Sequence, residues 1–579
     1  MLYPIINKSR NIIDLDGLWE FRFKDEDVWQ NIVVPSSFNN LIAREKARSY
    51  TGIVEYRRKF IIPSHFSKER KILRFDAVTH DATIYIDKEE VGRNNGGFLP
   101  FEIDISNLSC EKEHVLLVSV SNRINHHTFP IGNETGTAFF GSDNPGIPSV
   151  ERGKEKLRNQ NLPNFDFFNY SGITRHVRIY TTPKEYIRDV TIVPRIENDN
   201  GIVEFSILVE GEGIPQIEIL DREGKIVAEN SGIEGKITIK NAKLWNPWPE
   251  DPYLYSAKIT TKDDEYSLFF GIRSIEIKDS TFFINGKKFY FKGNGKHEDS
   301  PIRGRGVDEC LNLKDIGLLK WLNANSFRTS HYPYAEEMYK LCDKEGIVII
   351  DELPAVGLNF QGAINPYSLG NEDYHSALLH SLIERDKNHP CVVMWSLGNE
   401  PDTEHFPKDA LKYWSTLYKE AHSLDPQNRP VTMVCCQNDY TKDITTRTMD
   451  VVCINRYYGW YNLAGNLEIA KEAFIDEMEF WKKINKPLIL TEYGADSITG
   501  LHAIVAEMFT EEFQVKYLEA MNSVLDLYSF VCGEHPWNFA DFDTQQGPMR
   551  ANGNHKGLFT RDRTPKMAAY YTKNRWKGM

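Results

Sequence analysis

The stretch Val392-Val-Met-Trp-Ser-Leu-Gly-Asn-Glu-Pro401 joins a continuous apolar run to an acidic residue, Glu400. A second stretch, Pro487-Leu-Ile-Leu-Thr-Glu-Tyr-Gly494, repeats the arrangement around Glu492. Short apolar runs between polar residues are typical of strands that are buried on both faces in a parallel sheet. In a (β/α)₈ barrel the carboxyl ends of such strands hold the catalytic groups. The two stretches therefore predict two glutamates at the mouth of one barrel.

The sequence around these stretches alternates between strand-like and helix-like segments from about residue 275 onward. Glu400 follows the fourth strand-like segment and Glu492 follows the seventh. Eight such alternations predict a (β/α)₈ TIM barrel over residues 275–579. The strand-like segments end near Lys296-His297, Thr329-Ser-His331, Asp351-Glu352, Asn399-Glu400, Cys435-Cys436, Asn455-Arg-Tyr457, Thr491-Glu492 and Trp537-Asn538.

Two further territories precede the barrel. Residues 1–184 contain short alternating or β-branched runs separated by Gly, Asn and Pro, which predicts a jelly-roll β-sandwich. Residues 185–274 continue in about seven short strands with frequent turn signals, which predicts an immunoglobulin-like β-sandwich. The sequence thus indicates a multidomain chain of two sandwiches followed by a barrel.

The composition excludes several classes of partner. A net charge of −13 argues against nucleic acid or an anionic membrane surface as the main partner. No apolar run approaches the length of a membrane span, and residues 1–10 show no signal-peptide pattern. The eight cysteines form no C-x-x-C motif, so we expect reduced thiols in a cytoplasmic protein.

Cofactor motifs are also missing from the sequence. No His, Cys, Asp or Glu cluster has metal-ligand spacing, and no phosphate-binding loop is complete. We therefore expect neither a metal nor a cofactor. A flavin or another bound small molecule is left open.

The two glutamates suit the hydrolysis of a glycosidic bond. That reaction needs a proton for the leaving oxygen and negative charge beside an oxocarbenium-like carbon, and two carboxyl groups supply both. Asn399 precedes Glu400, and its side-chain amide is suited to bond a sugar hydroxyl. The residues alone therefore favour a glycosidase.

Nearly the whole chain resembles glycoside hydrolase family 2, and within it the bacterial β-glucuronidases. The stretches that carry the resemblance are Phe289-Tyr-Phe-Lys-Gly-Asn-Gly-Lys-His-Glu-Asp299, Arg328-Thr-Ser-His-Tyr-Pro-Tyr-Ala-Glu-Glu-Met338, Trp395-Ser-Leu-Gly-Asn-Glu-Pro-Asp-Thr403, Asn455-Arg-Tyr-Tyr-Gly-Trp-Tyr461, Thr491-Glu-Tyr-Gly-Ala-Asp496 and Trp537-Asn-Phe-Ala-Asp-Phe542. The resemblance implies hydrolysis with retention, with Glu492 as nucleophile and Glu400 as acid/base. A retaining pair stands about 5–5.5 Å apart, and we expect the charge of Glu492 to raise the pKa of Glu400.

The resemblance also implies a uronic acid as the sugar. Asn554 and Lys556, in Gly553-Asn-His-Lys-Gly-Leu-Phe-Thr560, match the family's carboxylate-binding residues. An ammonium and an amide both bind a carboxylate, which a neutral hexose lacks. Arg550 and Tyr461 match positions at the same end of the sugar.

Four further residues match family positions around the sugar. Asp166 lies in a loop of the first domain that reaches the barrel mouth in the family, and His331 ends the second strand-like segment. The resemblance places Tyr457 where it hydrogen-bonds Glu492 and keeps it ionised. It places Trp537 at the floor of the sugar subsite. The resemblance further implies a glucuronide substrate and a homo-oligomer, a tetramer or a dimer.

The segment from Leu358 to about Asp373 is shorter than in relatives that carry a long active-site loop there. That difference favours larger or oligosaccharide conjugates as substrates over small aryl glucuronides. Two alternatives to a β-glucuronidase remain. The first is a β-galacturonidase or β-galactosidase of the same family, since galacturonate also carries a carboxylate. The second is a non-catalytic carbohydrate-binding protein, which would need neither Glu400 nor Glu492.

Overall fold

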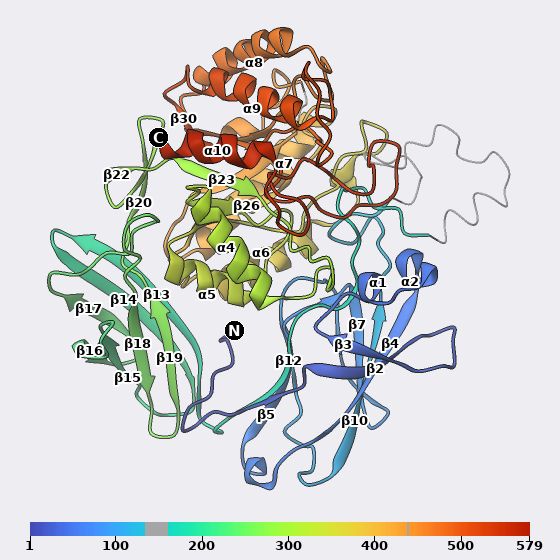
Figure 1. Ribbon diagram of the computed structural model, residues 1–579. Helices are drawn as coiled ribbons and strands as arrows, with labels where there is room; N and C mark the ends of the chain where they lie inside the picture. Colours follow the sequence, from blue (N-terminus) through green and yellow to red (C-terminus); the bar gives the residue numbers. More distant parts are fainter. Residues whose placement is uncertain (134–159, 437–438) are drawn as a thin grey trace.

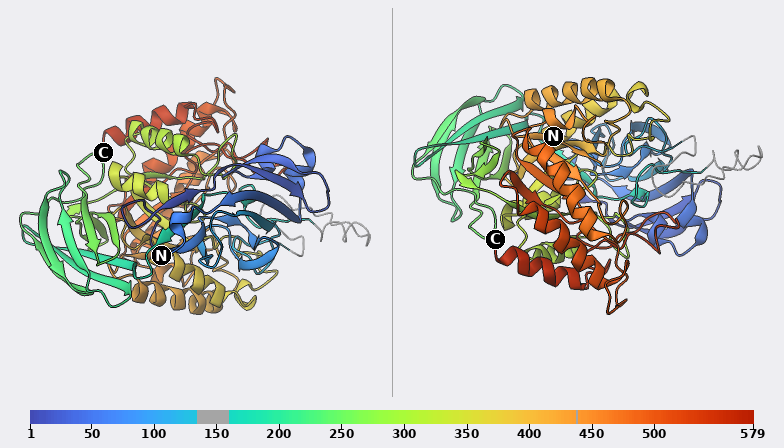
Figure 2. Two further views of the ribbon diagram at one scale, coloured as in Figure 1. Left: turned by 90° about the horizontal axis from the view of Figure 1, so that it is seen from below. Right: turned by 90° about the horizontal axis from the view of Figure 1, so that it is seen from above.

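The computed structural model describes residues 1–133, 160–436 and 439–579. Two β-sandwiches lie against one barrel, with the immunoglobulin-like sandwich and the jelly roll on different sides of it (Figures 1 and 2). This arrangement confirms the predicted multidomain fold. The predicted divisions at 184/185 and 274/275 remain our proposal for the domain boundaries.

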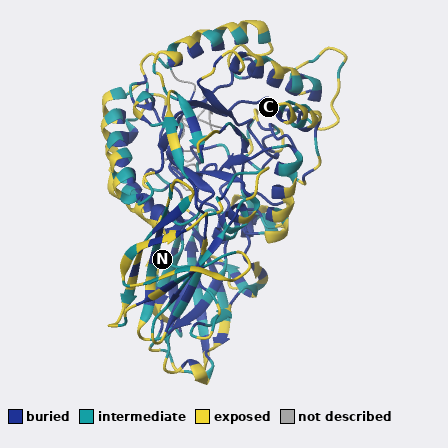
Figure 3. Ribbon diagram, turned by 90° about the vertical axis from the view of Figure 1, so that its left-hand side faces the viewer, coloured by how far each residue is buried: buried dark blue, intermediate teal, exposed yellow. Residues whose placement is uncertain are grey.

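The barrel consists of eight parallel strands closed in chain order from β23 to β30. Their bounds are β23 Phe291–Gly295, β24 Ser326–Arg328, β25 Val348–Glu352, β26 Val392–Asn399, β27 Val431–Cys435, β28 Val452–Asn455, β29 Leu488–Glu492 and β30 Val531–Glu534. All residues of β26 and β29 are buried, and the ribbon coloured by burial shows strands at the centre of the barrel in dark blue (Figure 3). In such a barrel, helices cover the outside of the sheet and side chains fill its interior. Glu400 therefore directly follows the fourth strand, and Glu492 is the last residue of the seventh.

The strand-like segment that was predicted to end near Trp537-Asn538 is longer than the strand in the structure. β30 ends at Glu534, and Trp537 lies in the loop that follows. Pro536 has no backbone N–H to donate to a neighbouring strand, so the ladder stops before it.

Helices surround the barrel, and their ends follow local sequence signals. Asp308 caps α4 by accepting from Leu311 N at 3.1 Å, and Thr510 caps α9 by accepting from Phe513 N at 3.1 Å. Gly346 closes α5 in the left-handed conformation that glycine favours. The bounds are α4 Glu309–Trp321, α5 Glu336–Glu345, α6 Glu372–Asp386, α7 Pro407–Leu424, α8 Leu467–Lys482, α9 Glu511–Leu525 and α10 Met567–Lys577, with short 3₁₀ turns at Pro366–Ser368 and Thr446–Thr448.

The jelly roll packs two antiparallel sheets, ordered β3-β2-β4-β10-β7-β8 and β1-β12-β5-β9, with a short pair β11-β6 beside them. Buried and more exposed residues alternate along β10, which gives the sandwich one apolar inner face. The bounds are β1 Ile12–Asp14, β2 Gly17–Phe23, β3 Gln30–Val34, α1 Phe38–Leu41, α2 Glu45–Ser49, β4 Ile53–Ile61, a 3₁₀ turn Ser64–Phe66, β5 Arg70–Phe75, β6 Val78–Thr79, β7 Asp81–Ile86, β8 Glu89–Asn94, β9 Phe101–Asp104, β10 Glu113–Ser121, β11 Gly172–Ile173 and β12 Val177–Thr182.

The immunoglobulin-like domain has two sheets, β13-β14-β17 and β16-β15-β18-β19. Its seven strands agree with the number predicted from the turn spacing. A three-stranded sheet, β20-β21-β22, then leads into the barrel. The bounds are β13 Tyr186–Glu197, β14 Asn200–Glu210, β15 Gln216–Leu220, β16 Ile226–Ser231, β17 Glu234–Ile239, β18 Tyr255–Thr260, β19 Glu265–Phe270, β20 Ile275–Lys278, β21 Thr281–Ile284 and β22 Lys287–Lys288.

A buried ion cluster ties the jelly roll to the barrel. Arg74 on β5 is 1% exposed and donates to Asp76 at 2.6 Å and to Glu336 at the start of α5. Glu102 lies 3.4 Å away from the same guanidinium. Charges this deep require partners, so the cluster fixes the position of the two domains.

We predict that Arg74→Met lowers the melting temperature markedly, because it takes the cation from the buried carboxylate of Glu336, while Asp76 keeps Arg178 at 3.0 Å. Breaking one side of a buried ion pair costs roughly 3–5 kcal/mol. Arg93→Ala is the matched control, since the Arg93 side chain is 70% exposed and pairs with Glu90 on the surface of the same domain. Thermal unfolding followed by circular dichroism measures both variants. Equal melting temperatures would contradict the role given to the cluster.

Candidate active site

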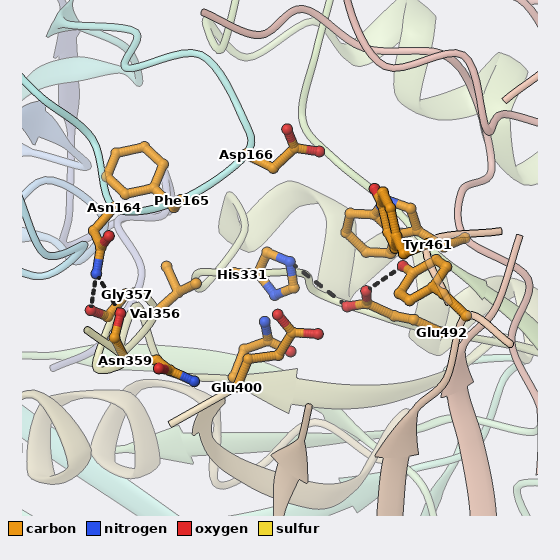
Figure 4. A pocket seen from close by; sticks show the side chains of 13 residues that line it. Asn164, Phe165, Asp166, His331, Val356, Gly357, Asn359, Glu400, Tyr461 and Glu492 are labelled. Atoms are coloured by element: carbon orange, nitrogen blue, oxygen red, sulfur yellow. Dashed lines mark hydrogen bonds and ion pairs between the residues drawn. The ribbon is translucent and has the colours of Figure 1, made fainter. Parts of the chain in front are cut away.

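One cavity at the carboxyl ends of the barrel strands brings together most of the residues predicted from the sequence (Figure 4). Strand-end residues surround it on the barrel side, and a loop of the jelly roll approaches from the other side. The predicted residues that line it are Asp166, His331, Asn399, Glu400, Tyr457, Tyr461, Glu492 and Trp537. Arg550, Asn554 and Lys556 lie behind this lining and bond to Asp166 and Tyr461.

Glu492 is held by two strong donors. Tyr457 donates its hydroxyl to Oε2 at 2.7 Å, and the guanidinium of Arg328 donates to Oε1. His331 Nε2 lies 3.7 Å from the same Oε1. Hydrogen bonds to an ionised carboxylate are stronger than neutral ones, so these donors favour the charged form of Glu492.

Glu352, the last residue of β25, is the second carboxylate on Arg328. Arg328 Nη1 donates to its two oxygens at 2.7 and 2.8 Å. His331 Nδ1 lies 2.8 Å from Oε1 and Ser396 donates to Oε2 at 2.8 Å. Both Arg328 and Glu352 are 0% exposed, so this pair is fixed within the barrel.

Glu400 has a different environment. Its carboxylate accepts a hydrogen bond from Asn455 Nδ2 at 2.9 Å, and its backbone N donates to Val434 O at 2.8 Å. Its φ of 53° lies in the left-handed region, which costs energy for a residue with a side chain. The surrounding hydrogen bonds hold this conformation, which turns Glu400 out of the strand direction and into the cavity (Figure 4).

Burial is the main cause of the pKa shifts of this pair. It raises the pKa of Glu400 and that of Glu492, and the charge of Glu400 raises the latter further. Burial is thus the largest cause for Glu400, whereas the expectation from the sequence named the charge of Glu492. Two interacting acids titrate as a unit, and the proton resides where the charged form has fewer donors. Burial raises the pKa of Glu492 to about 8, and Arg328 and Tyr457 oppose that rise by stabilising its charged form. From these donors we infer that the shared proton resides on Glu400.

A cationic group lies at the far end of the cavity, beyond Tyr461. Lys556 Nζ donates to Tyr461 OH at 3.0 Å, and Arg550 Nη2 donates to the same oxygen at 2.9 Å. Each cation has a carboxylate partner, Asp496 for Lys556 and Asp166 for Arg550. Lys556 is 1% exposed, so it is not an ordinary solvated loop lysine. Two positively charged groups thus donate to the same hydroxyl oxygen, that of Tyr461.

Asp166 comes from the jelly roll and completes this end of the cavity. Its Oδ1 accepts from Arg550 Nε at 2.7 Å, and its Oδ2 accepts from Asn554 Nδ2 at 2.8 Å. The neighbouring Phe168 N donates to Asp543 O at 2.9 Å, which fastens the loop to the barrel. The predicted reach of this loop into the barrel mouth therefore agrees with the structure.

His331 and Trp537 form a small aromatic wall. Their rings stack with centroids 5.1 Å apart and an interplanar angle of 21°. Gly295 lies against Trp537, since a Cβ at this position would come within 2.4 Å of the indole. The glycine therefore leaves the room that the tryptophan needs.

Family models match three consecutive parts of the chain. They are the sugar binding domain of glycosyl hydrolases family 2 over residues 6–183, a second family 2 domain over 185–273, and the family 2 TIM barrel domain over 275–579. The chain belongs to glycoside hydrolase family 2. It is therefore an enzyme of the glycoside hydrolase class, and a purely carbohydrate-binding protein is the weaker alternative.

Relatives of the family 2 chain match over its full length. A β-glucuronidase of Paenibacillus borealis is 41% identical over 100% of this chain and 99% of its own. The structure of a Faecalibacterium prausnitzii β-glucuronidase has a TM-score of 0.97 at 50% identity, covering 100% of this chain and 99% of that one. A Bifidobacterium dentium β-glucuronidase complexed with coumarin-3-O-glucuronide has a TM-score of 0.95 at 48% identity, with the same coverage.

Four residues of this family 2 site were missed by reasoning from the sequence. They are Arg328, Glu352, Asn455 and Asp496, each of which bonds a predicted site residue. A signal for three of them was present, because Arg328, Glu352 and Asn455 end the second, third and sixth barrel strands. Asp496 lies in the loop after the seventh strand, where its pairing with Lys556 depends on three-dimensional contact.

A possible metal-ligand cluster is formed by residues that are scattered in the sequence. Asp343, His389 and Cys391 place their ligand atoms within 4.8 Å of one another outside the catalytic cavity. Both oxygens of Asp343 are occupied, one by Cys391 N at 3.0 Å and one by His389 Nδ1 at 2.5 Å. The cluster is thus satisfied by its own hydrogen bonds.

Among the described residues, no helix is both long and apolar enough to cross a membrane.

We predict that Tyr457→Phe moves the acidic limb of the kcat/KM profile to higher pH by about one unit. The tyrosine hydroxyl lowers the pKa of Glu492, so removing it raises that pKa and protonates Glu492 at a pH where the wild type is still ionised. Tyr458→Phe is the matched control, because Tyr458 OH bonds Glu477 at 3.0 Å, away from the cavity. An unshifted limb in Tyr457→Phe would show that the hydroxyl does not tune Glu492.

Proposed function

We propose that this family 2 enzyme is a retaining β-glucuronidase that hydrolyses terminal β-D-glucuronides through a covalent glycosyl-enzyme intermediate. The observation that carries the proposal is the convergence of Lys556 and Arg550 on Tyr461, at the end of a cavity that holds Glu400 and Glu492. The catalytic pair defines the reaction type, and the cationic end defines the sugar. Its relatives of known structure include β-glucuronidases, one of them complexed with a glucuronide.

The first half of the proposed reaction uses the pair in its resting protonation state. Glu492 is ionised, so its carboxylate attacks the anomeric carbon and forms an ester bond to the sugar. Glu400 gives its proton to the glycosidic oxygen, and the aglycone leaves as an alcohol or phenol. Asn455 bonds Glu400 at 2.9 Å and thereby orients the carboxyl group that delivers this proton.

The second half reverses the roles. Esterification removes the negative charge of Glu492, so Glu400, now without its proton, is free to accept one from water. The hydroxide that forms attacks the anomeric carbon from the face that the aglycone left, and the ester bond to Glu492 breaks. Glu492 recovers its charge, Glu400 recovers its proton, and the sugar leaves with its original configuration.

The cationic end supplies the proposed preference for a uronic acid. Lys556, Arg550 and Asn554 offer donors to a C6 carboxylate, and a neutral hexose brings no anion to meet them. Asp496 bonds Lys556, and this ammonium lowers the pKa of Asp496 although burial raises it. Asp496 and Asp166 keep both cations fixed, so the end of the cavity is preorganised before substrate arrives.

The opposite side of the cavity, next to Glu400, would hold the aglycone. It is lined by Val356, Gly357 and Asn359 of the loop after β25 and by Asn164 and Phe165 of the jelly roll (Figure 4). Asn164 Nδ2 donates to Gly357 O at 2.6 Å and to Asn359 O at 2.9 Å, which joins the two loops. We propose that this wall takes larger or oligosaccharide aglycones, as the short 358–373 segment suggests.

The compartment and the assembly are also proposals. All eight cysteines are free, and six of them are buried, which suits the reducing cytoplasm. A homo-oligomer, a tetramer or a dimer, remains an expectation from the family resemblance.

We predict that Glu492→Ala lowers kcat on p-nitrophenyl β-D-glucuronide by about 10⁴-fold or more, because the nucleophile is lost. Glu400→Ala should lose much less with this substrate than with methyl β-D-glucuronide, since p-nitrophenolate leaves without a proton. Steady-state kinetics of both substrates measure the contrast. ¹H NMR of the first product checks the stereochemistry, and initial release of the α-anomer would contradict retention.

We predict that Lys556→Met lowers kcat/KM on p-nitrophenyl β-D-glucuronide by about 10²–10³-fold, the effect of losing a buried charged hydrogen bond. Hydrolysis of the corresponding glucoside and galactoside should change far less. The double variant Lys556→Met/Asp496→Asn is the control for leaving Asp496 buried without its cation. Unchanged glucuronide kinetics in both variants would refute the carboxylate role, and faster hydrolysis of the galacturonide by wild type would favour a β-galacturonidase.

A further inference from the structure

A second cavity lies between the jelly roll and the barrel and shares no lining residue with the catalytic one. Its volume is about 210 Å³. The jelly roll supplies most of its wall, from the start of β7, the loop after β8 and the loop after β10, and helix α6 of the barrel supplies Tyr374. The residues that line it are His80, Asp81, Asn95, Gly96, Asn125, His127, Thr128, Phe129 and Tyr374. Ligand sites occur preferentially at such domain interfaces.

The cavity contains a buried histidine with an unused ring nitrogen. His80 is 2% exposed, and its Nε2 bonds Asn169 Oδ1 at 2.7 Å, which requires the hydrogen on Nε2. Burial lowers the pKa of His80 to about 4, so the ring is neutral and Nδ1 is a hydrogen-bond acceptor. Among the residues that the structure describes, none bonds this Nδ1. Because this nitrogen is also inaccessible to solvent, His80 forms part of the wall of the cavity and is not a contact for a ligand.

Other polar groups around the cavity also have unused capacity. Asp81 accepts from the backbone of Gly96, and burial raises its pKa. The Oδ1 of Asn125 accepts from His127 N at 2.7 Å, which orients its amide nitrogen outward as a donor. Within the described parts of the chain, no partner is found for that nitrogen or for the Asn95 side chain. Acceptors and donors thus alternate around the cavity, which suits hydroxyl groups because they do both.

One wall of the cavity is aromatic. Phe129 and Tyr374 stack with centroids 5.6 Å apart at an interplanar angle of 15°. Gly96 fits closely against this pair, because a Cβ on it would come within 2.7 Å of Tyr374 OH. An apolar ring face beside hydrogen-bonding side chains is a surface on which the C–H face of a sugar ring packs.

The charge of the cavity disfavours an anion. Its nine lining residues include the carboxylate of Asp81 and neither lysine nor arginine. The catalytic cavity differs, since it has Lys556 and Arg550 for a carboxylate. The volume of the second cavity, about 210 Å³, corresponds to about seven waters at roughly 30 Å³ each. That is room for a single pyranose ring with its hydroxyls.

The second cavity lies on the aglycone side of the catalytic one. Asn359 lines the catalytic cavity. The ring of the next residue, Phe360, packs against the ring of His126, with the ring centroids 5.3 Å apart. His127 then lines the second cavity, and Asn371 bonds both His126 O at 2.7 Å and His127 Nδ1 at 3.3 Å. These contacts connect the two cavities through adjoining residues.

We propose that this cavity is a second carbohydrate site, which binds a neutral pyranose unit through Asp81 and Asn125 with its ring against Tyr374. The site performs no chemistry. It would hold a sugar unit of an oligosaccharide while the catalytic cavity holds the terminal residue, and it also stands if the terminal sugar is not glucuronate.

Isothermal titration of the full chain with cellobiose, lactose and methyl β-D-glucopyranoside, each up to about 10 mM, tests the proposal. We expect at least one of these probes to bind, and D-glucuronic acid added in excess should leave its affinity unchanged. Asp81→Ala and Asn125→Ala should each weaken binding at least about fivefold, with kcat/KM on p-nitrophenyl β-D-glucuronide unchanged. Glu89→Ala is the matched control, because Glu89 is an exposed carboxylate at the other end of the β7–β8 hairpin.

Several results would overturn the proposal. The absence of a binding signal for all three probes would do so. Binding that neither Asp81→Ala nor Asn125→Ala weakens would also do so. Probe binding that disappears when D-glucuronic acid is added would place the sugar in the catalytic cavity instead. Inorganic phosphate that binds with the same dependence on Asp81 would show that the site takes anions. Failure of wild type to hydrolyse glucuronides would refute the proposed activity. The titrations with the three neutral probes, and their weakening in the two variants, would still decide the second site.

Discussion

The guanidinium of Arg328 is the interaction on which the catalytic cavity depends. Three glutamates, Glu352, Glu400 and Glu492, lie close together at the end of the barrel, and water does not screen them well there. Arg328 bridges two of them with its planar fork, Nη1 toward Glu352 and Nη2 toward Glu492. Without this cation the carboxylates could not all remain close and ionised. With Arg328 ionised, one proton on the remaining glutamate is enough.

Glu352 gives this arrangement a further property in the proposed reaction. Formation of the glycosyl ester removes the charge of Glu492, and a lone Arg328 would then be a buried cation without a partner. Glu352 keeps it paired throughout, because it takes no part in the chemistry. The negative charge that leaves Glu492 reappears on Glu400 once its proton is gone. The net charge of these four groups therefore stays the same in both halves of the cycle, which avoids a large electrostatic cost.

Much of the fold was predictable because its signals are local. Apolar runs such as Val392-Val-Met-Trp395, alternating runs such as β10 and turn residues specify strands within a few positions, and the eight alternations specify the barrel. Pro536 ended the last strand earlier than expected, which a stricter reading of proline would have found. The site was partly predictable for the same reason, since Glu400, Glu492 and His331 follow strand ends. Glu352 could have been found in the same way, because it ends the third strand, but Asp496 depends on a partner far away in sequence, and spacing contains no such information.

The loop that carries Asp166 connects the two ends of the chain. Arg550 and Asn554, near the C-terminus, both bond an aspartate that belongs to the first domain. The barrel therefore has both glutamates of the proposed reaction but lacks one carboxylate that holds the cationic end of the cavity in place. In the proposed reaction, chemistry and selectivity are thus separable: a barrel parted from its jelly roll would keep the proposed acid and nucleophile, Glu400 and Glu492, and lose the rigidity of the cations that we propose to select the sugar. On this proposal, the choice of sugar is a property of the assembled chain and of none of its domains alone.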